Sequence, residues 1–528
     1  MVRTRVAGLA LVLALSAVVG PSASAFAGSA PVRAGTAAMA RIIVRAIDRN
    51  GHQFADRVVV AVPVGFITPF PEYSASASGV LDLPPGRYLL GTVVYTSASG
   101  ASQASGTLMA QVVRVRTVRT VTFDARQGRR VLVSLRIPGV QEVGGPFAVL
   151  CAPQSDLGIQ LAQTDGAEVI FAVPSRAPGL QFAFGADWQG TDGSGYLVGG
   201  VRRGIPGALR FSFGQSDLAT LTLRVAAGAS NGGSGYLQAF NLASCGATDG
   251  TGTAPSPVPF QTTLRVSAGK VGAVYLPFDR SDDTSGRTGK VLAGHRYTWT
   301  FGQAVRGPSP DALPRYFTPF ATSEVILGLG EFWSDPLAHG AQCCADGVVK
   351  LSARGRTIRT MRFRGGNGQY FKAWIRHAGW YTLSVTARRT PPPAGVTAAV
   401  LSARVGLTWR FHAPGSHLGF LSVPVSMTTL LPQGLDLRND AAPRAVTPLV
   451  LRIWRGLHTR GYRITKVQLL VSFDDGRTWR PVRVAESGGN WLARVHDPAS
   501  GFVSLRTIVT DVTGDRSVQT IIRGYGIR

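Results

Sequence analysis

Residues 467–484 read VQLLVSFDDGRTWRPVRV, and this segment decides the fold class. Apolar side chains alternate with other residues along its first part, at Val467, Leu469, Val471 and Phe473. An Asp475-Gly476 pair follows, and aromatic or apolar residues resume at positions 479, 482 and 484. Alternation with a period of two on both sides of an Asp-Gly pair predicts a β-hairpin with a tight turn.

The same hairpin carries the spacing S-x-D-x-G-x-T-W of an Asp-box turn, which is formed by Ser472, Asp474, Gly476, Thr478 and Trp479. In such a turn the hydroxyl and the carboxylate accept hydrogen bonds from turn amides, and the indole packs over the strands. Sialidases carry several such boxes, whereas one is visible here. We therefore interpret these five residues as a structural turn, which predicts a fold and no activity.

The rest of the chain repeats short alternating segments that are separated by turn residues. Its 528 residues include 64 Gly and 32 Pro, and 45% of them are hydrophobic, which excludes intrinsic disorder. No persuasive amphipathic helix is visible. We predict an all-β protein of several consecutive β-sandwich domains, because the length corresponds to roughly three or four domains.

The first residues have the pattern of a secretory signal peptide. Arg3 and Arg5 precede an apolar run over residues 6–19, and small residues follow it. We predict a signal peptide over residues 1–27 and a flexible lead-in over residues 28–40. No later stretch is long enough for a transmembrane helix, so we expect a secreted, extracellular protein without a transmembrane anchor, released or associated with the cell wall.

The formal net charge of +26 has two interpretations. The charge could attract an anionic envelope polymer. It could also lie on solvated sheet faces, as the alternation of Val113, Arg114, Val115 and Arg116 suggests. No basic cluster interleaved with aromatic residues is visible, and the chain is exported, so we do not expect nucleic acid as a partner.

Four cysteines, Cys151, Cys245, Cys343 and Cys344, favour disulfides in an exported chain. Three pairings are possible. We favour a bond between Cys151 and Cys245, each beside a predicted strand end. The adjacent pair at 343 and 344 would then be a vicinal disulfide or two free thiols.

One dense group of ligand-type residues comprises Asp335, His339, Cys343, Cys344 and Asp346. His339, Cys343, Cys344 and Asp346 are the candidate metal ligands. Zinc sites more often show C-x-x-C or H-x-H spacing. We therefore favour disulfide chemistry or turn residues here, and we predict no cofactor and no catalytic residue.

Residues 79–88 read GVLDLPPGRY, after a D-x-x-G turn at residues 48–51 and before VTFDAR at residues 121–126. This pattern resembles a carboxypeptidase-regulatory-like domain, which implies a prealbumin-like β-sandwich over residues 41–126. We expect a Gly-rich β domain over residues 127–258 and one or more β domains with the vicinal Cys loop over residues 259–444. An immunoglobulin-like sandwich is expected over residues 445–528.

Most of the chain after the signal peptide resembles the C-terminal accessory region of secreted subtilisin-like serine peptidases of high-GC bacteria. The resemblance rests on the opening module, on residues 380–383, 407–411 and 435–439, and on the ending over residues 504–526. The catalytic contexts of that family, such as H-G-T-H and G-T-S-M-A, do not occur in the sequence. The resemblance implies accessory modules without their enzyme, so no active residue is transferred.

These observations favour a non-catalytic protein that binds an anionic envelope polymer or an extracellular protein or polysaccharide. The alternative is a secreted hydrolase, a glycosidase or a peptidase-associated enzyme, with its site between residues 277 and 344. Four tryptophans are candidates for stacking on sugars, although most tryptophans in β-sandwiches are core residues: Trp188, Trp333, Trp374 and Trp491.

Overall fold

The computed structural model is almost entirely β, and it describes residues 39–53, 59–64, 73–75, 79–98, 104–152, 158–162, 169–230, 233–243, 246–253, 255–277, 284–310, 313–320, 322–330, 332–337, 345–365, 369–390, 398–413, 419–455 and 463–528. The predicted signal peptide lies outside these residues. Within them the helical segments are two single-turn 3-10 helices, η1 (Ala125–Gln127) and η2 (Gln215–Asp217). No helix of this part is long and apolar enough to cross a membrane. The predicted all-β class is confirmed.

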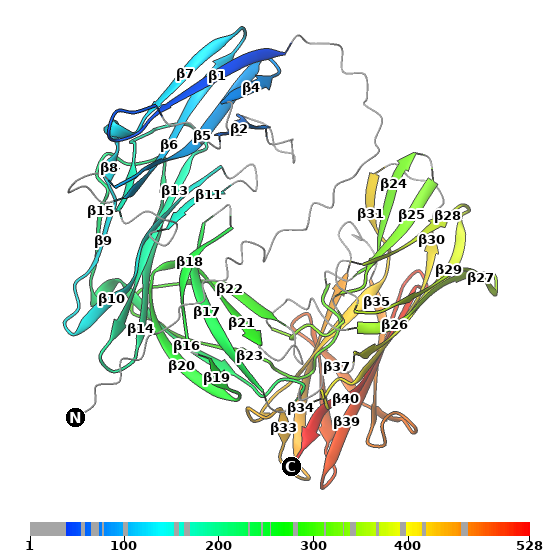
Figure 1. Ribbon diagram of the computed structural model, residues 1–528. Helices are drawn as coiled ribbons and strands as arrows, with labels where there is room; N and C mark the ends of the chain where they lie inside the picture. The colour runs from blue at the N-terminus through cyan, green and yellow to red at the C-terminus, as the bar shows by residue number, and fades with distance from the viewer. Residues whose placement is uncertain are drawn as a thin grey trace.

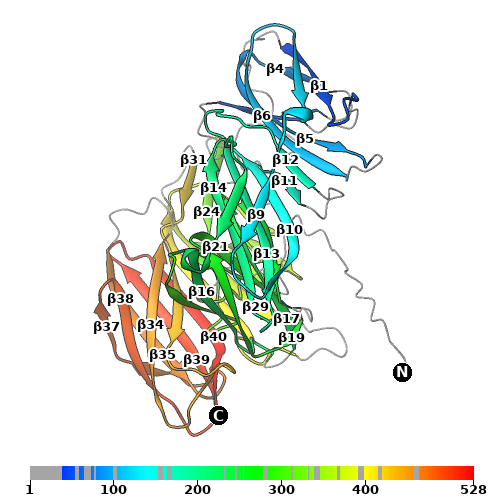
Figure 2. The same cartoon turned by 90° about the vertical axis from the view of Figure 1, so that its left-hand side faces the viewer.

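The first layers of the chain are a three-stranded and a six-stranded sheet, which lie at one extremity of the molecule (Figures 1 and 2). The three-stranded sheet contains β4 (Val80–Leu83), β1 (Ala40–Ile47) and β7 (Arg119–Asp124). The six-stranded sheet contains β3 (Tyr73–Ala75), β2 (Val59–Pro63), β5 (Gly86–Thr96), β6 (Ser105–Val115), β12 (Val169–Ala172) and β8 (Arg129–Arg130). Their facing side chains, including Ile42 and Leu90, form one core.

Strand β2 of the six-stranded sheet is buried on both faces. In β2, Val59 and Ala61 face the three-stranded sheet, whereas Val60 and Val62 belong to a second core on the opposite side. This double burial explains why β2 has a continuous apolar run where the strands of a half-exposed sheet would alternate.

The middle part is a seven-stranded sheet packed on a five-stranded sheet. The seven-stranded sheet contains β11 (Gly158–Ala162), β10 (Val140–Cys151), β13 (Gln181–Gly190), β14 (Gly195–Arg203), β20 (Phe260–Ser267), β16 (Leu218–Val225) and β23 (Arg296–Phe301). The five-stranded sheet contains β18 (Gly246–Gly252), β17 (Ser234–Ala243), β21 (Gly269–Pro277), β22 (Ser285–Val291) and β19 (Ser256–Pro257). A short pair, β9 (Leu132–Leu135) and β15 (Arg210–Phe213), supplies apolar side chains to a smaller core beside them.

The C-terminal part is organised around one nine-stranded sheet. It contains β27 (Arg356–Phe363), β26 (Ala345–Ala353), β29 (Gly379–Arg389), β30 (Arg404–Ala413), β40 (Arg516–Ile527), β39 (Gly501–Asp511), β35 (Ile464–Ser472), β36 (Arg480–Val482) and β33 (Asp440–Ala441). Antiparallel pairing of β30 with β40 makes this layer continuous, as Figure 1 shows.

Two four-stranded sheets cover one face of the nine-stranded sheet. The first contains β28 (Tyr370–Ile375), β25 (Thr322–Gly328), β24 (Arg315–Phe320) and β31 (Gly419–Ser422). The second contains β32 (Ser426–Pro432), β34 (Val446–Arg455), β38 (Asn490–His496) and β37 (Val484–Ser487). Side chains from all three sheets, including Phe371, Trp409 and Leu451, belong to one core.

Strand pairing crosses all three predicted boundaries between β domains. Strand β12 pairs with β6 across position 126, β20 pairs with β16 across position 258, and β40 pairs with β30 across position 444. The sheets are therefore shared between sequence-adjacent units, and the independent folding of those units stays a prediction.

Candidate anion-binding face

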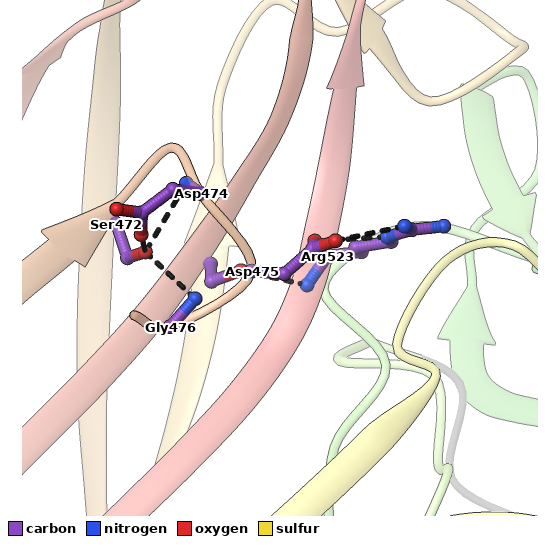
Figure 3. Close-up of polar contacts among 6 residues, drawn as sticks. Ser472, Asp474, Asp475, Gly476 and Arg523 are labelled. Atoms are coloured by element: carbon purple, nitrogen blue, oxygen red, sulfur yellow. Dashed lines mark hydrogen bonds and ion pairs between the residues drawn. The ribbon is translucent and has the colours of Figure 1, made fainter. Parts of the chain in front are cut away.

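The Asp-box residues form a closed hydrogen-bond network at the tip of the hairpin (Figure 3). The Ser472 hydroxyl donates to Asp474 Oδ1 at 2.7 Å and accepts from the Gly476 amide at 2.8 Å. Asp474 accepts from the Thr478 amide at 2.9 Å and from its hydroxyl at 2.6 Å. These bonds, led by that of the Thr478 hydroxyl, hold the pKa of Asp474 well below its usual range. The side chains of Ser472, Asp474 and Thr478 therefore bond within the turn, as a structural turn requires.

Two further contacts fix this turn against the nine-stranded sheet. Asp475 accepts two hydrogen bonds from the Arg523 guanidinium, at 2.9 and 2.8 Å (Figure 3), and these bonds lower the pKa of Asp475. The guanidinium carbon of Arg506 lies 4.1 Å from the ring centroid of Trp479. Both residues of the Asp475-Gly476 pair have positive φ values, 59° and 85°. Val471 pairs with Arg480, so the hairpin loop spans residues 472–479 and is longer than the tight turn that the Asp-Gly pair predicted.

The proposed metal ligands are only partly within the described residues, since His339, Cys343 and Cys344 lie outside them. The Asp346 carboxylate accepts hydrogen bonds from the Gly365 amide at 3.1 Å and the Thr390 hydroxyl at 3.0 Å. In the described ranges no group of three or more His, Cys, Asp and Glu residues could hold a metal ion. Asp346 therefore ties two loops together.

Cys151 is a fully buried, disulfide-bonded cysteine at the end of β10. Cys245 lies outside the described residues, as do the two vicinal cysteines. The favoured bond between Cys151 and Cys245 accordingly stays a prediction.

The region assigned to the alternative hydrolase contains a deeply buried carboxylate. Asp335 accepts hydrogen bonds from the amides of Gln303 at 2.9 Å and Leu337 at 2.8 Å, and its exposure is 1%. Nearby lies a cavity of about 200 Å³, whose lining includes Gln303, Leu337 and the carboxylate of Asp436. Asp436 accepts from the amides of residues 438 and 440. Both carboxylates therefore fix the positions of backbone amides. Among the described residues that line the cavity, Asp436 is the sole carboxylate, so the cavity has no pair of carboxylates of the kind that glycosidases use.

The uncovered face of the nine-stranded sheet carries many cationic residues. Alternation in β29 and β30 buries one set of side chains, such as Leu383 and Leu407, and turns the other set outward. We call the outward set the basic face. Its cationic residues are Lys350, Arg362, Arg388, Arg404, Arg410, Lys466, Arg506 and Arg516.

Two pairs of arginines lie directly opposite each other on this face. Arg388 of β29 is paired with Arg404 of β30, and Arg410 of β30 is paired with Arg516 of β40. All four side chains are exposed. Directly opposed side chains have Cβ atoms about 5 Å apart, and like charges in this position destabilise a sheet. The arrangement therefore repels itself unless anions approach it.

The charge of the basic face is largely uncompensated. Among the described residues none of its cations forms an ion pair. The described strands of this sheet contain three acidic residues: Asp346, which is opposite Arg388, and the buried residues Asp440 and Asp511 at strand ends. Asp475 lies near enough to Arg404 for that charge to help lower its pKa, although its ion pair is with Arg523. A strong positive potential results, and it is screened by salt.

A half-exposed tryptophan borders the arginine pair of β30 and β40. Trp380 of β29 is 36% exposed, and the guanidinium carbon of Arg410 lies 4.0 Å from its ring centroid. The imidazole of His412 meets the indole edge-on, with ring centroids 5.5 Å apart. The Arg410 contact is a cation–π interaction, which holds the guanidinium in place beside the ring.

The tryptophans chosen from sequence occupy different environments. Trp188 and Trp333 are core residues with 6% and 1% exposure, Trp491 packs against the C-terminal core, and Trp374 is 43% exposed on β28. Sequence reasoning did not single out Trp380 as a site residue. Its signal was the alternation in WYTLSVTARR at residues 380–389, which places Trp380 and Arg388 on one face of a strand.

Comparisons with known proteins give no family for this chain. No family model matches it, and no curated protein matches it. A Ca²⁺-stabilised adhesin that helps an Antarctic bacterium bind ice is 10% identical over 84% of this chain and 94% of that chain, with a TM-score of 0.15. The TIE protein of Bacillus anthracis is 10% identical over 70% of this chain and 71% of that chain, with a TM-score of 0.14. Immunoglobulin domains 1–5 of Sidekick-1 are 7% identical over 89% of this chain and 93% of that chain, with a TM-score of 0.11. At such TM-scores these likenesses carry no argument about function.

Proposed function

We propose that the protein is a secreted, non-catalytic β-sandwich protein that binds an anionic polymer of the cell envelope through the basic face. The observation that carries this proposal is the pair of directly opposed arginines, Arg410 and Arg516, beside the half-exposed Trp380. A sheet that places like charges opposite each other sacrifices stability, and a bound polyanion would remove that repulsion.

The predicted signal peptide supports export, and the resemblance to peptidase accessory regions supports binding modules that lack their enzyme. Asp335, in the region of the alternative hydrolase, and Asp436, at the nearby cavity, accept hydrogen bonds from backbone amides, which supports a structural role for both carboxylates. Charge complementarity favours an anionic polymer over an extracellular protein, since the basic residues extend across the strands of a broad sheet.

The test is retention of the full-length mature protein on purified, protein-free cell wall and on immobilised polygalacturonate. We expect retention at low salt and release near 0.5 M salt, where the screening length falls to a few ångströms. The charge-reversed variant Arg410→Glu with Arg516→Glu should lose retention at low salt.

The matched control is Arg87→Glu with Arg114→Glu. Arg87 and Arg114 are also exposed and directly opposed, on β5 and β6 of the six-stranded sheet, so the control makes the same change in net charge at another place. Equal loss of retention in both variants would show that net charge controls binding, and it would overturn the assignment of binding to the basic face. Release of reducing ends or free amines from the wall would overturn the non-catalytic assignment.

A further inference from the structure

The basic face carries its opposed arginines at two separate places along the same strands. Arg404 and Arg410 are six residues apart on β30, which places them about 20 Å apart along the strand. Each has an arginine partner on a neighbouring strand, Arg388 for the first and Arg516 for the second. A ligand that contacts both pairs must therefore be extended along β29 and β30.

The stretch between the two pairs is polar and uncharged on these strands. The outward residues of β29 and β30 in this stretch are Thr382, Ser384, Thr386, Gly406 and Thr408. The hydroxyls of the serine and the three threonines are both donors and acceptors, which suits the hydroxyl groups of sugars. A polymer that carries neutral hydroxyl groups beside its charges fits this sequence of subsites better than one that lacks them.

Trp380 lies at the outer end of the Arg410 pair. Its outward neighbour along β29 is Thr382, and His412 is directly opposite it on β30. Indoles bury the apolar face of a ligand while their edge stays in water, which is a property used with sugar rings. Arg410 stacks on the same indole at 4.0 Å and supplies the charge for an acidic group beside the ring.

We propose that the basic face holds two anion subsites, the Arg388–Arg404 pair and the Arg410–Arg516 pair, that are bridged by one extended acidic polysaccharide lying along β29 and β30 with a sugar against Trp380. This inference rests on the proposed function and adds the ligand class, its direction and its minimum length. Once a ligand is bound at one subsite, its contact with the other subsite is intramolecular. The affinity should therefore increase abruptly at the ligand length that reaches both subsites.

The test measures binding of the full-length mature protein to oligogalacturonates from dimer to dodecamer, by calorimetry at low salt. We expect weak binding of short oligomers, followed by a step of roughly tenfold or more at the length that spans both pairs. Arg388→Ala with Arg404→Ala should abolish the step and leave the Arg410–Arg516 pair as the one remaining subsite for short oligomers. Affinity that increases smoothly with length in the native protein would overturn the two-subsite arrangement.

A second comparison tests the ligand class. Trp380→Ala should weaken the binding of a long oligogalacturonate severalfold and weaken the binding of inorganic polyphosphate of similar charge much less. Equal effects on both ligands, or tighter binding of polyphosphate by the native protein, would overturn the saccharide assignment while the anion-binding function stands. If the protein binds neither ligand and is not retained on polygalacturonate or on cell wall, the proposed function itself fails.

Discussion

Arg410 and Arg516 lie directly opposite each other on β30 and β40, and Arg410 also stacks on Trp380 at 4.0 Å. The aromatic contact stabilises one guanidinium, whereas its arginine neighbour repels it. Binding and stability are therefore expected to oppose each other at this position, because the repulsion that costs stability also attracts an anion.

Replacement of Arg516 by threonine separates these two effects. Arg516→Thr should raise the free energy of unfolding by about 0.2–1 kcal/mol, since it removes the repulsion and introduces a β-branched residue on a strand. The same change should weaken retention on polygalacturonate. Urea denaturation followed by tryptophan fluorescence measures the first effect, and binding at low salt measures the second.

The control for this substitution is Arg114→Thr, which relieves the corresponding repulsion against Arg87 in the six-stranded sheet. It should have no effect on retention. A destabilised Arg516→Thr protein would contradict the expected repulsion, and unchanged retention would contradict the role of Arg516 in binding.

The Asp-box turn should make stability depend on pH through Asp474. Hydrogen bonds from Thr478 and Ser472 lower the pKa of Asp474 in the folded protein below the ordinary value near 4. The unfolded chain therefore binds the proton first, so this stabilisation is present above about pH 4 and is lost as the pH falls through the lower folded pKa. Asp474→Asn should reduce stability at neutral pH and approach the native protein in acid.

Thermal unfolding between neutral and strongly acidic pH checks this expectation. Glu486→Gln is the control, because it removes an exposed carboxylate from β37 and makes the same charge change. A constant difference between Asp474→Asn and the native protein at every pH would mean that the Asp474 carboxylate does not supply the pH dependence.

Asn439 connects the middle and C-terminal parts of the molecule. Its carbonyl accepts from the Ala304 amide at 2.8 Å, and its amide donates to the carbonyls of Gly302 at 2.9 Å and Gly228 at 3.3 Å. The residue is buried and has a φ of 65°, in the left-handed region. Asn is one of the few residues that adopt this conformation easily.

Two substitutions at this position distinguish the hydrogen bonds from the backbone conformation. Asn439→Gly can adopt the same positive φ without strain, so it should destabilise the protein by about 1–3 kcal/mol through the lost hydrogen bonds alone. Asn439→Ala should cost about 1 kcal/mol more, because alanine is strained at positive φ. Hydrogen exchange at the Ala304 amide should accelerate in both. If the Ala304 amide of Asn439→Gly exchanged as slowly as in the native protein, the hydrogen bond to Asn439 would not connect the two parts of the molecule.

The sequence predicted strand faces more reliably than strand neighbours. Alternation over residues 113–116 correctly placed Val113 and Val115 in the core and turned Arg114 outward, because the side-chain period is a local property of a strand. Pairing of β30 with β40 joins residues more than a hundred positions apart. No local pattern encodes that neighbour, so the opposition of Arg410 and Arg516 was not predictable.

The Asp box and the basic face also differed in how far the sequence predicted them. The Asp box was recognisable, because all its hydrogen bonds form within eight consecutive residues. The basic face was visible only as an excess of arginine, since its definition needs the order of strands in the nine-stranded sheet. Local chemistry is readable from sequence, whereas a surface assembled from distant strands is not.

A buried tyrosine and its carboxylate partner should limit stability at alkaline pH. Tyr525 is fully buried, and its hydroxyl donates to Asp497 Oδ1 at 2.8 Å. Burial, and then the negative charge of Asp497, raise the pKa of Tyr525 far above its ordinary value near 10. The unfolded chain therefore releases this proton first, so stability should fall as the pH rises above about 10.

Tyr525→Phe removes both the titration and the hydrogen bond. It should destabilise the protein by about 1–3 kcal/mol at neutral pH, because a buried Asp497 oxygen loses its donor. The variant should also lose less stability than the native protein between pH 9 and 12. Tyr370→Phe, at a residue that is 50% exposed, is the control and should leave both quantities unchanged. A tyrosine that stays protonated only in the folded state must contribute to the fall in stability at alkaline pH. If the stability of the native protein and of Tyr525→Phe fell equally with pH, another group would control the alkaline loss of stability.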